Sequence, residues 1–195
     1  IEAGLRSFDM NMPEEINRVV TDRISNLLLT PDKISSQNLI NEGLDKGKIK
    51  LVGNIMIDTL LDQKRKAHKI SKIAIVKNNR FDYQEDKHHN LDKFGLITLH
   101  RPSNVDNKND LEKLINLFIN KISAKIFLIW PLHPRTLENL KKYNLLNRLI
   151  SAQKIFLLDP ISYREMLKLN TDAAITFTDS GGVQEECCVL GTPCL

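Results

Sequence analysis

Four short apolar segments recur at regular intervals in the second half of this chain. The stretches between them repeat apolar residues every three or four positions, which is the spacing of an amphipathic helix. Alternation of this kind is typical of β-α units, whose strands pair in parallel through right-handed crossovers. The pattern predicts an α/β fold in which residues 94–195 form a mostly parallel sheet flanked by helices. The predicted strands are "GLITLH" (95–100), "KIFLIW" (125–130), "KIFLLD" (154–159) and "AAITFT" (173–178).

Polar or turn-forming residues follow each of these predicted strands. The carboxyl ends of parallel strands lie along one edge of a sheet, and α/β proteins bind their ligands at that edge. We therefore expect these residues to share one rim, which consists of His100-Arg101, His133-Pro134-Arg135, Asp159-Pro160 and Ser180-Gly181-Gly182.

The beginning of the chain predicts a separate α/β unit. Pro13 stands where a helix can start. The apolar residues that follow fall on one helical face, formed by Ile16, Val19, Val20 and Ile24. A strand at 27–30, a second helix from about Lys33 and a strand at 49–54 complete this unit.

Residues 58–92 differ from both flanks, because they are polar, rich in lysine and poor in strand signals. They predict a connecting helix and linker between a first domain at 1–57 and a second domain at 93–195. The chain begins with isoleucine instead of methionine, and its last residues, "GTPCL", have the pattern of a strand that is just starting. We therefore expect a piece of a longer protein.

The composition of the chain limits the class of protein to which it can belong. With 195 residues, of which 42% are hydrophobic, the chain is expected to be globular rather than disordered. No apolar run approaches the roughly 18 residues of a membrane span, and no signal-peptide pattern is present. We expect no membrane partner and a cytoplasmic location.

Missing patterns argue against several kinds of site. Cys187, Cys188 and Cys194 include no C-x-x-C pair and predict neither a disulfide framework nor a zinc site. There is no G-x-G-x-x-G, no P-loop and no G-x-S-x-G, so we expect no cofactor and no hydrolase nucleophile. The net charge of +4 is mild, and the basic stretch Lys64–Lys72 lacks the interleaved aromatic residues that stack on bases. We expect no nucleic-acid partner and no metal; the charge favours an anionic small molecule.

The stretch "TFTDSGGVQEECC" (176–188) places a β-rich run directly before Ser180, Gly181 and Gly182 and a helix-like segment. A strand that ends in a glycine turn at a helix N-terminus leaves backbone N–H groups free, and the helix dipole favours a negative charge there. This arrangement suits a phosphate. A tight turn in which the Ser180 hydroxyl caps the helix explains the same residues, so the motif alone leaves both interpretations open.

Three residues have side chains suited to acid-base chemistry. Glu2 lies in "EAGLR", and Glu14 opens "PEEINR" at a predicted helix N-terminus. The helix dipole stabilises an acid at that position whether or not it has a function. His100 follows a predicted strand. A lone histidine is more often structural than catalytic, but a place on the ligand rim favours a functional role.

Several separated motifs give the chain a resemblance to a known family. The stretches "IEAGLRSFDMNMPEEINRVVTD", "VGNIMID", "LHRPSNVDN" and "TDSGGVQEE" followed by "LGTPCL" resemble the UDP-N-acetylglucosamine 2-epimerase family, in order and over essentially the whole chain. The resemblance implies an internal piece of the non-hydrolysing type, with two Rossmann-like domains of glycosyltransferase-B type. The first domain would lack its beginning and the second its end. A homodimer is implied as well.

The same resemblance implies a reaction and a role for each candidate residue. UDP-N-acetylglucosamine and UDP-N-acetylmannosamine would be interconverted by elimination and readdition of UDP, with inversion at carbon 2 of the sugar. Glu2 and Glu14 would be the acid/base carboxylates, and a protonated His100 would stabilise the departing diphosphate. The UDP-binding residues would be Ser180, Gly181 and Gly182 at the diphosphate, Glu186 at the ribose hydroxyls, and Ile161 and Met166 beside the uracil.

The chain departs from the family pattern at two places. Cys187 stands where alanine is common, and "HRPSN" replaces HR-x-E-N. A nucleotide-sugar glycosyltransferase would share the architecture and the anion-binding turn. Other open alternatives are a hydrolysing epimerase that releases N-acetylmannosamine and UDP, an epimerase of a diacetamido uronic acid, and an inactive nucleotide-sugar-binding piece.

Overall fold

The computed structural model describes residues 1–81 and 91–195. Contacts within the chain divide it into two units, Ile1–Thr59 and Leu60–Leu195. Both units combine helices with parallel strands, so the predicted α/β class is confirmed. Among the described residues, no helix is long and apolar enough to cross a membrane.

The first unit contains one parallel pair of strands. β1 (Leu28–Thr30) and β2 (Ile49–Leu51) pair in parallel, with α2 (Lys33–Asn41) and a 3₁₀ turn (Lys46–Lys48) between them in the chain. The strands and α2 lie where the sequence predicts them, and the side chain of Asp32 caps the start of α2. The small apolar core of this unit consists of Ala3, Leu28 and Leu39, with Leu44 and Ile49 packed against it.

Helix α1 (Pro13–Ile24) begins at the predicted proline, but its predicted apolar face does not lie in the core of this unit. Three residues of that face are exposed in the described chain: Ile16, Val20 and Ile24. The buried residues of α1 are two acids, Glu15 and Asp22. Charged contacts, rather than apolar packing, therefore attach α1 to its own unit.

The segment 58–92, which the sequence predicts to be a connecting helix and linker, contains most of one helix and all of another. These are α3 (Ile55–Ala67) and α4 (Lys72–Asn79). Both bury apolar side chains in the second unit, namely Leu60, Ala67, Ile75 and Val76. Residues 82–90 of the predicted linker lie outside the described residues.

The second unit is built on a four-stranded sheet. Strands β3 (Phe94–Thr98), β4 (Phe127–Pro131), β5 (Ile155–Leu158) and β6 (Ile175–Thr178) lie at the predicted positions. Their order is β5-β4-β3-β6, and every neighbouring pair is parallel. The mostly parallel sheet predicted for residues 94–195 is confirmed.

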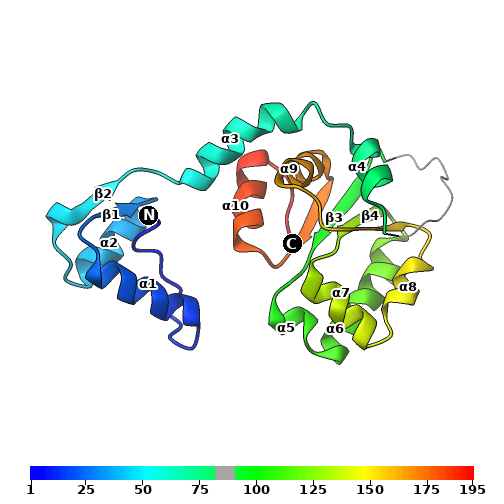
Figure 1. The fold of residues 1–195 in the computed structure, drawn as a ribbon, viewed down its shortest axis with the longest axis horizontal. Helices are drawn as coiled ribbons and strands as arrows, with labels where there is room; N and C mark the ends of the chain where they lie inside the picture. The colour runs from blue at the N-terminus through cyan, green and yellow to red at the C-terminus, as the bar shows by residue number, and fades with distance from the viewer. Residues whose placement is uncertain (82–90) are drawn as a thin grey trace. The chain divides into compact units, whose positions relative to one another are not determined.

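Helices follow the strands as the β-α pattern predicts. In chain order they are α5 (Pro102–Val105), α6 (Lys108–Leu117), a π-helical turn (Phe118–Ile122), α7 (Pro134–Lys142), α8 (Leu146–Ile150), α9 (Tyr163–Asp172) and α10 (Gly181–Leu190). Figure 1 shows α5 to α8 on one side of the sheet and α4 and α9 on the other.

The sheet separates two apolar cores. In β4, Leu128 and Trp130 belong to the core shared with α5 to α8, whereas Ile129 between them belongs to the core shared with α4 and α9. This alternation follows from the two-residue period of a strand. All five residues of β3 are buried, as expected for a central strand covered on both faces.

The order of the strands places a topological switch point beside β3. From β3 the chain moves outward to β4 and β5, and it then returns to place β6 on the other side of β3. Ligands of open α/β sheets bind outside the carboxyl ends of the strands at such a point. The residues that follow β3 and β6 include His100 and Ser180.

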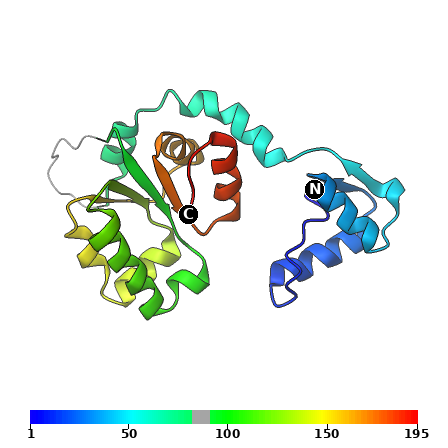
Figure 2. The ribbon, with the colours of Figure 1, turned by 180° about the vertical axis from the view of Figure 1, so that it is seen from behind.

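The chain continues beside β6 after α10. Gly191 ends α10 in a left-handed conformation, with φ of 77°. Cys194 then forms a parallel bridge with Thr176, which agrees with the strand start that "GTPCL" predicts. Figure 2 shows the C-terminus lying next to the strands of this unit.

Candidate functional site

The "EAGLR" stretch of the first unit holds Glu2 in an uncommon backbone conformation. Its φ is 59°, in the left-handed region, and a non-glycine residue there costs about 1–3 kcal/mol. The turn is fixed by Gly4, whose amide donates a hydrogen bond to the buried Asp22 at 2.9 Å. A Cβ atom at Gly4 would collide with the carbonyl oxygen of Ser35. Because Glu2 is exposed and has no side-chain partner among the described residues, this conformation favours a functional role.

Arg6 of the same motif is a structural anchor. Its side chain is buried and pairs with Asp22 at 2.8 Å and with Glu42 at 2.7 Å. The hydrogen bond to Glu42 raises the pKa of Arg6, despite the opposing effect of burial. The positive charge of Arg6 is therefore compensated within the unit, and it is not available to an anionic ligand.

The two adjacent acids at the start of α1 have opposite environments. The Glu15 carboxylate is buried and accepts hydrogen bonds from the amides of Ser7 and Phe8, both at 3.0 Å. Burial alone would raise the pKa of Glu15, but these hydrogen bonds outweigh it and hold the pKa below its usual range. Glu14 is exposed and has no partner among the described residues. Glu15 therefore stabilises the turn before α1, while Glu14 is free to meet a ligand.

A pocket of about 250 Å³ lies at the carboxyl ends of the strands in the second unit. It joins residues from the ends of all four strands, and this confirms the predicted shared rim for His100, His133, Pro160 and Ser180. Its wall consists of Thr98, Leu99, His100, Pro131, Leu132, His133, Pro134, Pro160, Ile161, Met166, Ser180 and Val183. The pocket is therefore mostly apolar, with two imidazoles and the hydroxyl groups of Thr98 and Ser180.

Ser180 caps α10, as one of the two sequence interpretations predicts. Its hydroxyl oxygen accepts a hydrogen bond from the Val183 amide at 3.4 Å, and its own amide donates to Thr178 Oγ1 at 3.0 Å. Capping does not exclude an anion, because the first amides of a helix, here those of Gly181 and Gly182, have no acceptor within it.

Neither glycine is required by the local structure. Both have ordinary backbone angles, and no other part of the described chain lies within 4 Å of the place that a Cβ atom would take. Alanine at these helical positions would be more stable than glycine. The absence of side chains at Gly181 and Gly182 leaves open space directly in front of the helix N-terminus, where a ligand can approach the backbone.

His100 is held by Asp179, a residue that the sequence analysis does not single out. Nδ1 of His100 lies 3.0 Å from a carboxylate oxygen of Asp179. The backbone amides of His100 and Arg101 donate to the same carboxylate, at 3.0 Å and 2.9 Å. Asp179 follows β6 directly, and an acid at a strand end in "TDSGG" is the signal that could have identified it.

His133 lies next to His100. Its Nδ1 faces a hydrogen-bond donor, whereas Nδ1 of His100 faces a carboxylate oxygen. The two rings lie 5.4 Å apart between centroids. Nδ1 of His133 accepts a hydrogen bond from the Arg135 amide at 3.2 Å, which caps α7. Burial lowers the pKa of His133, and the charges of His100 and Arg135 lower it further. His133 is therefore a neutral imidazole whose Nε2 carries the proton.

Glu186 lies within α10 and is not part of the pocket wall. It is buried, and burial raises the pKa of its carboxyl group. Tyr163 donates a hydrogen bond to it at 3.0 Å. Burial, together with this hydrogen bond, raises the pKa of Tyr163 to about 12, so the phenol keeps its proton at neutral pH. Tyr163 is a second residue that the sequence analysis misses, because its partner lies on another helix.

The structure thus brings together His100, Ile161, Met166 and Ser180 in one pocket, with Gly181 and Gly182 following at the start of α10. Glu2 and Glu14 belong to the first unit. Among residues 1–81 and 91–195, no group of three histidine, cysteine or acidic side chains could hold a metal ion. The three cysteines are free thiols.

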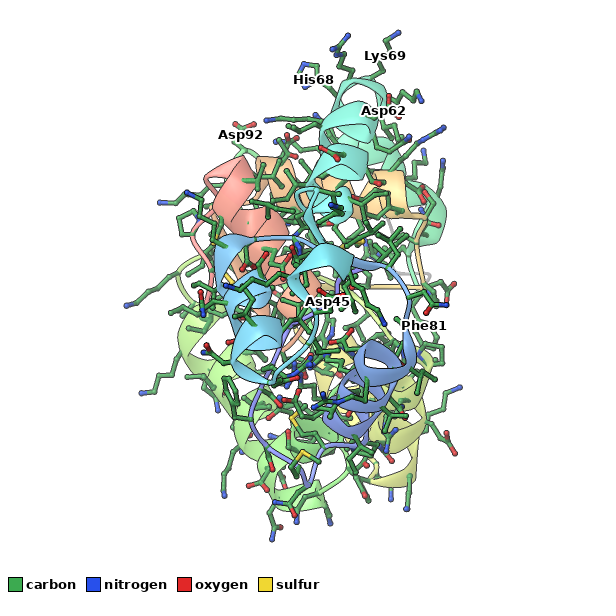
Figure 3. All side chains as sticks on the ribbon, turned by 90° about the vertical axis from the view of Figure 1, so that its left-hand side faces the viewer. Asp45, Asp62, His68, Lys69, Phe81 and Asp92 are labelled. Carbon is green, nitrogen blue, oxygen red and sulfur yellow. The ribbon has the colours of Figure 1, made fainter. Side chains whose placement is uncertain are left out.

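A larger cavity, of about 630 Å³, lies elsewhere on the second unit, between α3 and α9. Its wall consists of Leu61, Lys64, Arg65, His68, Lys168 and Thr171. It shares no residue with the rim of the sheet, and Figure 3 shows the side chains of His68 and Lys69 extending outward from the end of α3. We take the smaller pocket as the candidate site because it lies at the switch point, where open α/β sheets bind their ligands.

Comparison with known proteins places this architecture in a family. A family model described as UDP-N-acetylglucosamine 2-epimerase matches residues 1–195. The UDP-N-acetylglucosamine 2-epimerase of Methanocaldococcus jannaschii is 44% identical over 197 residues, which cover 100% of this chain and 51% of that protein. The UDP-2,3-diacetamido-2,3-dideoxy-D-glucuronate 2-epimerase of Pseudomonas aeruginosa is 37% identical, and the match covers 100% of this chain and 50% of that protein. The chain spans about half the length of the curated relatives it matches.

Solved structures agree with these similarities. The crystal structure of the M. jannaschii enzyme in complex with UDP-GlcNAc and UDP superposes with a TM-score of 0.83 at 43% identity, over 100% of this chain and 51% of that chain. The crystal structure of the Neisseria meningitidis UDP-GlcNAc 2-epimerase bound to UDP-GlcNAc superposes with a TM-score of 0.78 at 31% identity. The match covers 100% of this chain and 51% of that chain. Fold and sequence therefore point to the same relatives.

Proposed function

Because the chain belongs to the UDP-N-acetylglucosamine 2-epimerase family, we propose that the full-length protein interconverts UDP-N-acetylglucosamine and UDP-N-acetylmannosamine. The reaction proceeds by elimination and readdition of UDP, with inversion at carbon 2 of the sugar. The observation that carries the proposal is the pocket at the switch point of the second unit, where His100 and the turn at Ser180 meet an apolar wall. Two related proteins have been solved with UDP-GlcNAc bound, which supports this class of ligand.

The UDP moiety fits the chemistry of this pocket and of α10. The diphosphate binds at Ser180, Gly181 and Gly182, through the free amides of the two glycines at the helix N-terminus, where the helix dipole favours its negative charge. The ribose hydroxyls donate hydrogen bonds to Glu186, which Tyr163 already holds in place. The uracil ring lies against the apolar side chains of Ile161 and Met166.

The substrate explains why carboxylates are needed. The hydrogen on carbon 2 is not next to a carbonyl group, so direct deprotonation is slow. When the bond between carbon 1 and the diphosphate oxygen breaks, its electron pair leaves with UDP and carbon 1 becomes electron-poor. A carboxylate then removes the acidified hydrogen, and a double bond forms between carbons 1 and 2. Protonation of carbon 2 on the other face, with return of UDP to carbon 1, gives the epimer.

Each proposed catalytic residue has a local environment suited to its role. Glu2 and Glu14 are exposed carboxylates without partners in the described chain, and they act as acid and base on opposite faces of the sugar. His100 has one ring nitrogen bound to Asp179, and its protonated form stabilises the departing diphosphate through the other. The buried Glu15, which is fully engaged by backbone amides, has no part in the chemistry.

We include in the proposal the assembly that family membership suggests. The full-length protein forms two Rossmann-like domains of glycosyltransferase-B type, acts as a homodimer in the cytoplasm, and needs no cofactor. The match to solved epimerases over the whole of this chain supports the fold in this proposal.

Product analysis tests the proposed function. The full-length protein, incubated with UDP-N-acetylglucosamine and followed by proton NMR, is expected to give UDP-N-acetylmannosamine with the sugar still attached to UDP. Release of free N-acetylmannosamine would identify a hydrolysing enzyme instead. If UDP-N-acetylglucosamine stays unchanged and a UDP-diacetamido uronic acid is converted, the protein has the activity for which the P. aeruginosa relative is named.

A further inference from the structure

Asp179 receives an unusual concentration of hydrogen bonds at the end of β6. Its side chain is only 6% exposed, and it faces the loop that follows β3. The His100 amide donates to both carboxylate oxygens, at 3.1 Å and 3.0 Å, and the Arg101 amide donates at 2.9 Å. Nδ2 of Asn104 donates at 3.0 Å. These contacts attach the loop after β3 to the end of β6.

One contact of Asp179 differs from the others because it involves a side chain of the pocket. His100 Nδ1 lies 3.0 Å from Asp179 Oδ1, while 41% of the His100 side chain remains exposed. An ionised carboxylate only accepts hydrogen bonds, so Nδ1 must carry a proton. The other ring nitrogen, Nε2, is then on the side of the ring directed away from Asp179.

We propose that Asp179 is a positioning residue for His100, and this inference rests on the proposed function. Asp179 keeps the proton on Nδ1 and leaves Nε2 as the nitrogen that gains or loses a proton. Protonation at Nε2 gives an imidazolium whose charge is balanced by the carboxylate behind it. That imidazolium is oriented to stabilise the diphosphate as the bond to carbon 1 breaks.

Replacing Asp179 by asparagine changes the hydrogen bonding in a defined way. The amide oxygen is still required by the amides of His100 and Arg101, so the NH₂ group faces Nδ1. Nδ1 then accepts, and the single proton of the neutral ring moves to Nε2. An imidazolium is disfavoured because its Nδ1 proton would point at another donor. The ring stays in the pocket but loses the charge that the departing diphosphate needs.

His133 provides an internal reference for this change. Its Nδ1 accepts a hydrogen bond from the Arg135 amide, so its proton is on Nε2. The two neighbouring rings therefore have opposite protonation patterns in the native protein. Imidazole ¹⁵N spectra distinguish a protonated from an unprotonated nitrogen, and they require no turnover.

The kinetic experiment compares Asp179→Asn with Asn104→Ala in the full-length protein. Asn104→Ala removes one hydrogen bond to the same carboxylate and leaves the imidazole contact intact. Hydrogen-bond partners that orient a functional histidine typically matter by about 10–100-fold, as they do at metal sites. We expect kcat to fall by about that factor in Asp179→Asn, with a much smaller change in UDP affinity. Equal losses of kcat in the two variants, alongside equal losses of thermal stability, would show that Asp179 only holds the loop and would overturn the inference.

The spectroscopic experiment separates this inference from the proposed function. In the wild-type protein without substrate, His100 is expected to show a protonated Nδ1 and His133 an unprotonated one; in Asp179→Asn, the His100 Nδ1 becomes unprotonated. A wild-type His100 without a proton on Nδ1 overturns the inference, even if the Asp179→Asn variant does not fold. A protein that does not epimerise UDP-N-acetylglucosamine but shows the expected spectra refutes the proposed reaction and leaves the pairing of His100 with Asp179 supported.

Discussion

The Glu14→Gln variant of the full-length protein is expected to lose about 10²–10⁴-fold in kcat, because a positioned acid or base contributes that much to proton transfer at carbon 2. UDP affinity is expected to stay nearly unchanged, since the loss concerns an interaction made only in the transition state. Glu14 is exposed and unpaired in the described chain, so its replacement removes no structural contact. Steady-state kinetics and calorimetry with UDP measure the two quantities.

Glu15→Gln is the matched control, because the two acids are adjacent in the first turn of α1. The buried Glu15 carboxylate accepts from two backbone amides, and its replacement is expected to lower the free energy of unfolding by about 1–3 kcal/mol at neutral pH. Because the pKa of Glu15 is lowered in the folded state, its stabilising effect is present above its unfolded pKa and is lost as the pH falls through its folded pKa. The two variants therefore become alike in stability in acid.

The Glu2→Gln variant extends the same test, and its loss of kcat should match that of Glu14→Gln. Full activity in both the Glu2 and Glu14 variants would mean that these carboxylates have no part in the reaction. The left-handed backbone at Glu2 would then need another explanation.

The Gly181→Val variant is expected to weaken UDP binding by about 10–150-fold, which corresponds to the loss of one hydrogen bond to a charged group, about 1.5–3 kcal/mol. The valine side chain occupies the open space in front of the α10 N-terminus and keeps the diphosphate away from the backbone amides. Calorimetry with UDP measures the change.

The Gly181→Ala variant distinguishes an effect on UDP binding from an effect on helix stability. Alanine favours a helix more than glycine does, so thermal stability should be equal or higher. We expect UDP affinity to fall in this variant as well, by less than in Gly181→Val. Unchanged UDP affinity in both variants would show that Ser180 and the glycines form only a capped turn.

The sequence predicts the second unit well because its pattern is local and repeated. Each strand is a short run of apolar residues followed by a turn, as at β4 before His133 and β6 before Ser180, and no distant contact is needed to recognise it. Parallel pairing then places the strand ends on one rim by geometry alone. The shared pocket of His100, His133, Pro160 and Ser180 follows from that arrangement, whereas Ile161 and Met166 are expected only from the family resemblance.

Other features depend on contacts between distant residues and cannot be predicted from local patterns. Asp179 holds His100 across two strands, 79 positions apart in the sequence. Glu14 and Glu15 are the same residue type in the same helical turn, and they are distinguished by the burial of Glu15 and by its contacts with the amides of Ser7 and Phe8 and with Arg18. The apolar face of α1 is correctly predicted as a face, but its exposure is visible only in the folded chain.

The central claim is that carbon 2 exchanges its hydrogen with the solvent while UDP leaves and returns. The most direct test is to incubate the full-length protein with UDP-N-acetylglucosamine in deuterium oxide and to examine the product by proton NMR. We predict UDP-N-acetylmannosamine with deuterium at carbon 2. UDP-N-acetylmannosamine that retains the original hydrogen at carbon 2 would contradict the proposed elimination and readdition.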